Sequence, residues 1–292
     1  ISMCVNTFLN YVLIFGKFGA PALGVTGAAI ATFTSRVVEF LVAMGFALFN
    51  RRLPLKPRCI FRPGTFIFHS FVKYSTPVVA NEAMWSLGTS MLTVIMGHMD
   101  NSQDMLAAYA LIGNIDKLST VVCFGIAASA AVIVGKEIGA GTDYQKVYEI
   151  SWTLLLVSLM IGGGVALLLL GLLPTFFLPV LFPLFKLSTG ATLAATSMAI
   201  VYAVFMPMRA FDIANITGVL RAGGDARTAS IIDITPLWLV AIPLMAVTAL
   251  VFNAPVPLVC IAMQAENLCK CPLGLIRFHS RKWIHDITRI EP

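Results

Sequence analysis

Charge is scarce in this sequence. Only 12% of its 292 residues are charged and 58% are apolar, whereas a typical soluble domain has about 25% charged residues. The mean hydropathy is +0.88. So few charged side chains do not cover the water-facing surface of a globule of this size. The composition therefore excludes a soluble globular domain, a disordered chain and a nucleic-acid-binding domain, and we expect lipid to surround most of the protein.

Motifs of enzymes and metal sites are also missing. The six cysteines lack the paired spacing of a disulfide framework or a zinc site. The sequence has no GxSxG or HExxH motif and no phosphate-binding GxxxxGK motif. We therefore expect no enzyme, no structural metal, no resident cofactor and no nucleic-acid partner.

What the sequence does contain is long apolar runs. A bilayer core of about 30 Å needs about 20 helical residues. Eight runs separated by polar or Gly/Pro breaks have a suitable composition, at 1–16, 25–50, 74–97, 106–134, 148–173, 191–218, 230–252 and 256–276. They predict an all-α polytopic membrane protein. The first run is too short to cross the core and begins at Ile1, so we expect a fragment that starts inside a helix.

Basic residues predict the orientation of these spans. Fourteen of the 20 lysines and arginines lie in four segments, 51–73, 135–147, 219–229 and 277–292. The loops on the opposite side contain only Lys17 and Lys186. Because short cytoplasmic loops are enriched in basic residues, we predict that the four segments and the C-terminus face the cytoplasm. This distribution also explains the net charge of +6.

The longest of these connections divides the chain. It is basic and contains three prolines, which favour an extended linker over a helix. Six spans after such a linker are typical of one half of a two-half transporter. The predicted domains are two last helices of an N-terminal lobe (1–50), a cytoplasmic linker (51–73), a six-helix C-terminal lobe (74–276) and a cytoplasmic tail (277–292).

Ionisable residues inside spans cost about 2.5–3.5 kcal/mol each, so they normally face a cavity, a partner or water. Glu82 follows Pro77, which removes a backbone donor and leaves carbonyl oxygens free. Together with the Asn81 amide these oxygens suit a hard cation or a proton. The alternative is a glutamate near the cytoplasmic entrance that contacts headgroups or Lys73.

A second group lies around Pro207. Arg209 and Asp212 are three residues apart on one helix face, so they either neutralise each other or Asp212 binds a proton or cation and frees Arg209. Asp116 and Lys117 are adjacent and therefore about 100° apart on a helix. We expect one of them to pair with another span and the other to line a cavity.

Three other polar pairs have helical spacing. Asn6 and Asn10 either bond to a neighbouring helix or line a polar pocket. Glu39 follows Arg36 by one turn, and an ion pair is the alternative to a role in a cavity. Glu266 and Lys270 are four residues apart on one helix face, which predicts a helix-stabilising pair.

Several stretches resemble the multidrug and toxic compound extrusion (MATE) family. They are NYVLIFG at 10–16, GVTGAAIAT at 24–32, GKEIGAG at 135–141 and GVLRAGGDART at 218–228. The resemblance covers essentially the whole chain, as helices five to twelve of twelve. It implies a cation-coupled antiporter in the plasma membrane, acting as a monomer, in which two six-helix lobes rock around a central cavity and expel organic, often cationic, drugs.

The resemblance also implies site residues. The family's carboxylate on the seventh helix is similar to Glu82, and the acid on the tenth helix is similar to Asp212. The distance from this acid to the following Gly-x-Leu-Arg stretch differs by about half a turn from some members. Thr32 resembles a hydroxyl of the sixth helix. Asn6 and Asn10 occupy positions where some members have an Asn and an Asp, so the Asp of the first lobe is absent here.

These arguments lead to one expected function, an Na⁺- or H⁺-driven exporter of organic cations. The coupling ion is expected at Glu82, Asn81, Asp212 and Asp116. The substrate cavity or first-lobe polar site is expected at Asn6, Asn10, Thr32, Glu39 and Arg209. The alternative is a flippase for lipid-linked precursors, whose anionic headgroup would require several unpaired basic residues. Three of the four deep basic residues have an acid one helical turn away, which favours export.

Overall fold

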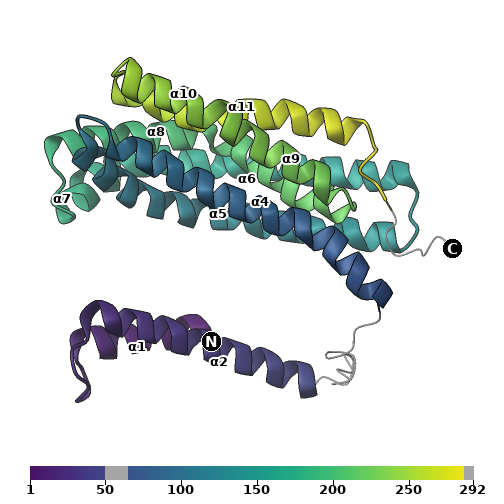
Figure 1. Ribbon diagram of the computed structural model, residues 1–292, viewed down its shortest axis with the longest axis horizontal. Coiled ribbons are helices and arrows are strands. Elements are labelled where there is room, and N and C mark those ends of the chain that lie inside the picture. Colours follow the sequence, from purple (N-terminus) through teal and green to yellow (C-terminus); the bar gives the residue numbers. More distant parts are fainter. Residues whose placement is uncertain (50–64, 286–292) are drawn as a thin grey trace. The chain divides into compact units, whose positions relative to one another are not determined.

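The computed structural model describes residues 1–49 and 65–285, and within these ranges it is almost entirely helical, with no strand (Figure 1). The predicted all-α architecture is therefore confirmed. The chain divides into two compact units, residues 1–70 and 71–292. This division lies near the end of the predicted linker 51–73.

The first unit contains a hairpin of α1 (Ser2–Phe15) and α2 (Gly24–Phe49). Gly16 ends α1 in the left-handed conformation, with φ of 65°, which glycine adopts at little cost. Gly27 lies so close to α1 that a Cβ atom there would stand 2.6 Å from the carbonyl oxygen of Leu13. The hairpin therefore depends on glycine at the turn and at the helix contact.

The second unit is a bundle of long helices, and α4 crosses the boundary between the units (Figure 1). Its elements are α4 (Thr65–Gly97), α5 (Ser102–Gly139), α6 (Tyr144–Leu172), η1 (Leu173–Leu181), α7 (Phe182–Leu184), α8 (Thr189–Asp212), η2 (Ile213–Leu220), α9 (Ala226–Pro236), η3 (Leu237–Ala241), α10 (Ile242–Ala246), η4 (Val247–Val251) and α11 (Val256–His279). The η elements are π-helical, with wider turns than an α-helix.

Proline accounts for some of these wider turns. Pro179 lies inside η1, and η3 directly follows Pro236. Because proline has no backbone N–H group, it leaves a carbonyl oxygen one turn earlier without its helical donor. Local widening of the helix re-satisfies such oxygens inside a membrane. The rods formed by α6–η1–α7 and α9–η3 consequently continue through the π-helical turns.

Each of the eight predicted apolar runs has a helix in the structure. Within the described residues, five of these helices or helical rods are long and apolar enough to cross a membrane, at 24–48, 102–139, 144–184, 189–220 and 226–251. The predicted start of the third run at residue 74 was late, because α4 begins at Thr65. All three linker prolines precede Thr65 and lie outside the described residues.

α8 is central to the packing of the second unit, since it contacts α5, α6 and α11. Small residues permit close approach of helices in membranes. Gly162 of α6 shows this, because a Cβ atom there would lie 2.5 Å from the Cβ of Ala210 and 3.0 Å from the Cα of Pro207. The turn of α8 that follows Pro207 is thereby held against α6.

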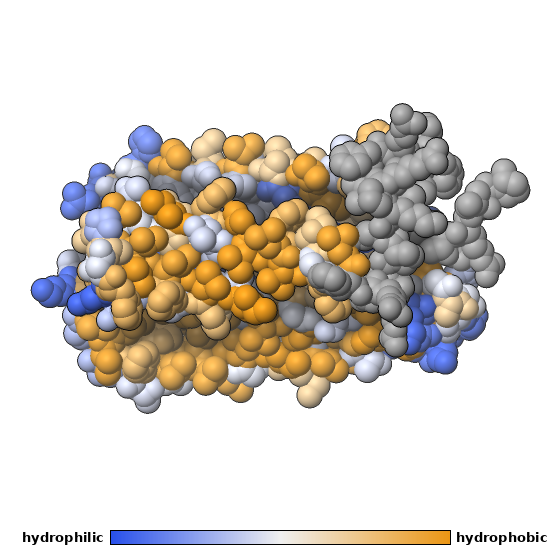
Figure 2. Space-filling view, turned by 90° about the horizontal axis from the view of Figure 1, so that it is seen from below, coloured by the Kyte–Doolittle hydropathy of each residue, from blue (hydrophilic) through white to orange (hydrophobic). Residues whose placement is uncertain are grey.

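Hydrophobic side chains cover most of the visible surface, and hydrophilic side chains gather toward the two ends (Figure 2). Large apolar residues on the bundle helices are widely exposed, among them Leu118 at 74%, Met160 at 75% and Leu239 at 71%. A surface of this kind is stable in lipid and not in water. It agrees with the low charge content of the sequence.

Candidate functional site

Ion-paired side chains form three groups among the described residues of the second unit. One is Arg277 with Asp225, and the other two contain residues predicted for the site, the first of them as a single pair. Arg209 of α8 donates to Asp116 of α5 through two parallel bonds, from Nη1 to Oδ1 at 2.5 Å and from Nη2 to Oδ2 at 3.0 Å. Both side chains are 18% exposed. The guanidinium carbon also lies 5.7 Å from the ring centroid of Tyr202, a cation–π distance. We call Asp116 and Arg209 the closed pair.

The closed pair answers two questions left open by the sequence, namely the partner of Arg209 and the different roles of Asp116 and Lys117. Arg209 is neutralised by an acid of another helix, so the local pairing with Asp212 is not formed. Of the adjacent residues Asp116 and Lys117, Asp116 pairs across to α8 while Lys117 is exposed. A planar guanidinium binds a carboxylate best through two parallel bonds, and Asp116 supplies that geometry from across the helix interface.

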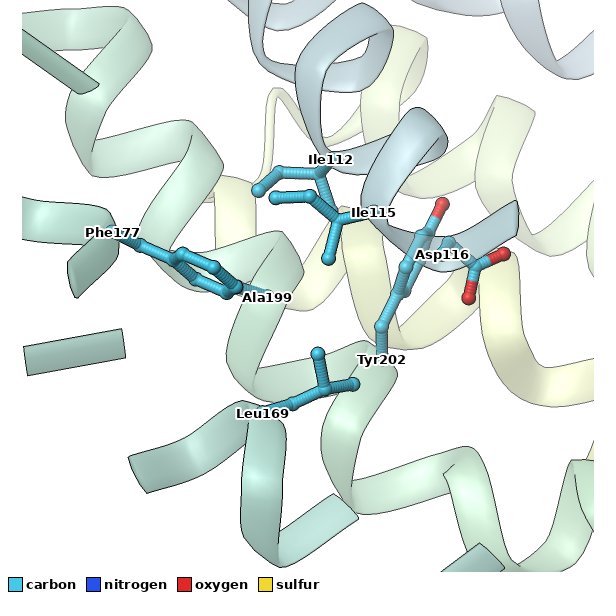
Figure 3. Close-up of a pocket in the computed structure, with 7 residues that line it drawn as sticks. All are labelled: Ile112, Ile115, Asp116, Leu169, Phe177, Ala199 and Tyr202. Carbon is cyan, nitrogen blue, oxygen red and sulfur yellow. The ribbon is translucent and has the colours of Figure 1, made fainter. Parts of the chain in front are cut away.

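A small pocket adjoins the closed pair (Figure 3). It is lined by Ile112, Ile115, Asp116, Leu169, Phe177, Ala199 and Tyr202. In Figure 3 the apolar side chains converge on one side of Tyr202, and the carboxylate of Asp116 points away from them. Arg209 already neutralises that carboxylate, and the rest of the pocket wall is mostly apolar.

The second group contains four acids from four helices. They are Glu82 of α4, Asp212 of α8, Asp233 of α9 and Glu266 of α11. Arg221 and Lys270 are basic residues of the described part of the chain that contact them. We call these six residues the acid cluster. Four acids against two bases leave an excess of negative charge when all are ionised.

Lys270 occupies the buried part of the acid cluster. Its Nζ lies 2.9 Å from Asp233 Oδ1 and 3.1 Å from Glu266 Oε2, and its side chain is 7% exposed. The predicted pair of Glu266 and Lys270 is thus formed. Asn81 Nδ2 donates to Asp233 Oδ2 at 3.0 Å. These contacts hold Asp233 half-buried between α4 and α11.

Glu82 lies at the edge of the cluster, with 62% of its side chain exposed. Arg221 Nη1 is 3.4 Å from Glu82 Oε1, and Arg221 Nη2 is 3.8 Å from Asp233 Oδ2. Asn81 is buried and points to Asp233. Adjacent helical residues point about 100° apart, so Asn81 and Glu82 face different neighbours.

Asp212 is the most unusual residue of the cluster. It is 3% exposed, and neither of its carboxylate oxygens has a hydrogen-bond partner within the described ranges. It interacts electrostatically with Lys270, Asp233 and Glu266. A carboxylate buried without a direct bond carries a large desolvation cost. This cost is relieved when the carboxylate takes up a proton or a cation.

Asn215 lies one turn after Asp212 and was not singled out from the sequence. It is fully buried, and its amide nitrogen and oxygen also have no hydrogen-bond partner among the residues described. Gly274 of α11 makes room for it, because a Cβ atom there would lie 2.7 Å from Asn215 Nδ2. Its spacing of three residues from an acid inside a span was a signal that could have identified it.

The polar residues of the first unit bond mainly to each other. Asn6 Nδ2 lies 3.4 Å from Thr32 Oγ1 and 3.3 Å from Ser35 Oγ, and Asn10 Nδ2 donates to Asn6 Oδ1 at 3.0 Å. Asn6 therefore connects α1 to α2, as one of the two alternatives predicted, whereas Asn10 bonds to Asn6 within α1. A role of Asn6 and Asn10 in a substrate cavity stays a prediction.

Glu39 forms the ion pair that was the alternative to a role in a cavity. Its Oε2 lies 2.7 Å from Arg36 Nη1, and the side chains are 50% and 73% exposed, respectively. No cluster of three or more His, Cys, Asp or Glu residues suited to a metal ion occurs in the parts of the chain that are described.

Comparisons with known proteins agree with this fold. The MatE family model matches residues 77–247, more than half of the chain. The chain is 26% identical over 282 residues to "Uncharacterized transporter YisQ" of Bacillus subtilis, covering 96% of the chain and 60% of that protein. It is 26% identical over 284 residues to "Probable multidrug resistance protein NorM" of Thermotoga maritima, covering 96% and 58%.

Solved structures show the same fold. An outward-facing multidrug resistance MATE family transporter of the MOP superfamily matches with a TM-score of 0.80 at 18% identity, over 96% of this chain and 61% of that one. The eukaryotic MATE transporter AtDTX14 matches with a TM-score of 0.80 at 18% identity, over 97% and 60%. The chain thus spans about three-fifths of the length of these proteins. With its predicted resemblance confirmed by the family model, the chain belongs to the MatE family.

Proposed function

We propose that this chain forms the larger part of an exporter that expels organic, often cationic, drugs or toxic metabolites in exchange for Na⁺ or H⁺. Family membership supports the export of drugs, since several relatives carry the name of a multidrug resistance protein. The observation that carries the proposed coupling is the buried Asp212 carboxylate without a direct bond, beside an excess of acids.

Asp212 is well placed to convert ion binding into movement. An ion shifts a conformational equilibrium only if it binds one state more tightly than the other. Asp212 is the last residue of α8, the central helix of the bundle, and the π-helical η2 begins directly after it. Neutralising this carboxylate removes the cost of burying it, and so favours the arrangement in which it is most deeply buried.

The other predicted residues take different parts in this proposal. Glu82, at the exposed edge of the acid cluster, receives the ion, and Asn81 orients Asp233. Asp116 was expected to bind the ion as well, but Arg209 already neutralises it. We therefore assign the closed pair to holding α5 against α8, rather than to ion binding.

The proposed membrane orientation follows from the basic segments. A plasma-membrane location with the C-terminus in the cytoplasm agrees with the excess of lysine and arginine in 135–147, 219–229 and 277–292. A monomer is the simplest arrangement for a transporter with two lobes in one chain. Protease protection of a C-terminal tag in intact cells would test the orientation.

The alternative of a flippase for lipid-linked precursors lacks support from the described residues. An anionic headgroup would need basic side chains that are free to bind it. Arg209, Arg221 and Lys270 each contact a carboxylate. The buried basic residues are therefore already neutralised by acids of the bundle.

Ethidium efflux from membrane vesicles containing the complete gene product tests the proposal. An imposed Na⁺ or pH gradient should drive efflux, and an ionophore that dissipates the gradient should stop it. Asp212→Asn should reduce gradient-driven efflux at least tenfold, because the amide cannot exchange a cation or proton. The exposed Glu149→Gln is the matched control and should retain full efflux. Full gradient-driven efflux by Asp212→Asn would overturn the assignment of Asp212.

A further inference from the structure

Lys270 places an ammonium group between two acids of the acid cluster. Its ammonium group contacts one carboxylate oxygen of Asp233 and one of Glu266, at 2.9 and 3.1 Å. Carboxylate oxygens converging from two helices are also the ligands that a hard cation takes in proteins. The protein thus supplies a cation of its own where an ion would find the most negative surroundings.

A lysine side chain can move away from its carboxylate partners more easily than an arginine side chain. An ammonium group is a compact charge on a flexible stem of four carbons, whereas a guanidinium is held by a planar fork of donors. Arg209 uses that fork in both bonds to Asp116. Lys270 makes one contact with each of two acids, so it can move away without breaking a bidentate pair.

The helix around Lys270 also permits movement. Pro272 lies inside α11 two residues after Lys270, and it removes the backbone donor that would bond to the carbonyl of Leu268. Gly274 follows on the same helix, against the amide of Asn215. The turn that carries Lys270 is therefore less firmly bonded than a regular α-helical turn.

Asp212 connects Lys270 to the proposed coupling. The two side chains interact electrostatically, and an ion bound at Asp212 would therefore be repelled by the nearby ammonium. If Lys270 moved away, the same ion would gain Asp233 and Glu266 as neighbours. The ammonium and the ion cannot bind Asp233 and Glu266 at the same time.

We propose that Lys270 is a tethered competitor of the coupling cation. Its ammonium neutralises Asp233 and Glu266 in one state, and a hard cation such as Na⁺ replaces it among the same acids in the other. This inference rests on the proposed coupling at the acid cluster and adds the residue that determines how tightly the ion is held. Lys270 weakens ion binding and so helps the ion to be released.

Na⁺ binding to purified protein tests this inference. The midpoint of thermal unfolding in detergent is followed while NaCl replaces choline chloride at constant ionic strength. Lys270→Gln should bind Na⁺ at least tenfold more tightly than the parent protein. Lys270→Arg and the exposed control Lys117→Gln should remain within threefold of the parent. Equal or weaker Na⁺ binding by Lys270→Gln would overturn the proposal.

A double variant separates competition from a general change of charge. Lys270→Gln combined with Glu266→Gln leaves the net charge unchanged and avoids an additional unpaired acid, so it is also the variant to use if Lys270→Gln does not fold. Competition predicts that it still binds Na⁺ more tightly than the parent, because the ammonium has left Asp233. Na⁺ binding equal to the parent would contradict the inference.

The efflux assay keeps this inference separate from the proposed function. If the parent protein shows no gradient-driven efflux, the export proposal is rejected, whatever the Na⁺ titrations show. If the parent shows gradient-driven efflux but neither Lys270→Gln nor its combination with Glu266→Gln binds Na⁺ more tightly, only the competitor role is rejected. Tightened binding in both variants supports the competitor role, independently of which drug is exported.

Discussion

The closed pair and the acid cluster use the same types of residue in opposite ways. In the closed pair, Asp116 and Arg209 match in number and geometry, so both charges are satisfied by two parallel bonds. In the acid cluster, four acids share two basic residues, and Asp212 has no direct bond among the described residues. A matched pair stabilises one arrangement of helices, whereas an unmatched cluster remains responsive to ions.

Breaking the closed pair should have the largest effect on stability. Asp116→Asn leaves the Arg209 guanidinium buried without its counter-charge, and the loss of one partner of a buried pair typically costs about 3–5 kcal/mol. We expect the free energy of unfolding in detergent to fall by about 3 kcal/mol. Denaturant titration of the purified protein measures the change.

A variant that removes both charges of the closed pair is the control for this prediction. Asp116→Leu combined with Arg209→Met removes both charges and should recover most of the lost stability. Na⁺ binding should be nearly unchanged in the double variant, because neither residue belongs to the acid cluster. A double variant as unstable as Asp116→Asn would show that the pair contributes through packing rather than charge.

Gly274→Ala should have an intermediate effect, and it should act through Asn215, one turn after Asp212 of the acid cluster. The new Cβ atom would lie 2.7 Å from Asn215 Nδ2, so the amide or α11 must shift. Overpacking of this kind costs about 1–3 kcal/mol. We expect a loss of about 1 kcal/mol in unfolding free energy and altered Na⁺ binding. Gly164→Ala, at an open position, is the control, and equal losses in both variants would refute the proposed contact.

Tyr202→Phe should have the smallest effect. It keeps the aromatic ring 5.7 Å from the Arg209 guanidinium and both bonds to Asp116, so it should change the unfolding free energy by less than about 0.5 kcal/mol. Tyr202→Leu removes the ring, whose interaction with the cation is worth about 2 kcal/mol at a buried site. An equal loss of unfolding free energy in both variants would show that the hydroxyl, and not the ring, contributes to stability. Denaturant titration again provides the comparison.

The sequence predicted the helices well because the bilayer imposes a length and a composition on each one. All eight apolar runs correspond to helices, and the pairs Arg36–Glu39 and Glu266–Lys270 are local pairs within one helix. The start of α4 was predicted too late, because the prolines that suggested an extended linker all precede Thr65.

Contacts between helices were not predictable from the same evidence. Arg209 has an acid one turn away in Asp212, yet it pairs with Asp116 on α5. The choice depends on how α5 and α8 pack, which the spacing within one helix does not contain. The same is true of Asn215 and Gly274, since their contact joins η2 to α11. The functional roles of the predicted site residues remain predictions.

The wider turns of η2 have a consequence for the angular positions of the residues on either side. Asp212 and Arg221 are nine residues apart, and at about 100° per residue an ideal α-helix would direct them to opposite sides. The intervening segment, 213–220, is π-helical, so each residue turns through a smaller angle. Asp212 and Arg221 both interact with Asp233. η2 therefore brings both residues toward the same acid.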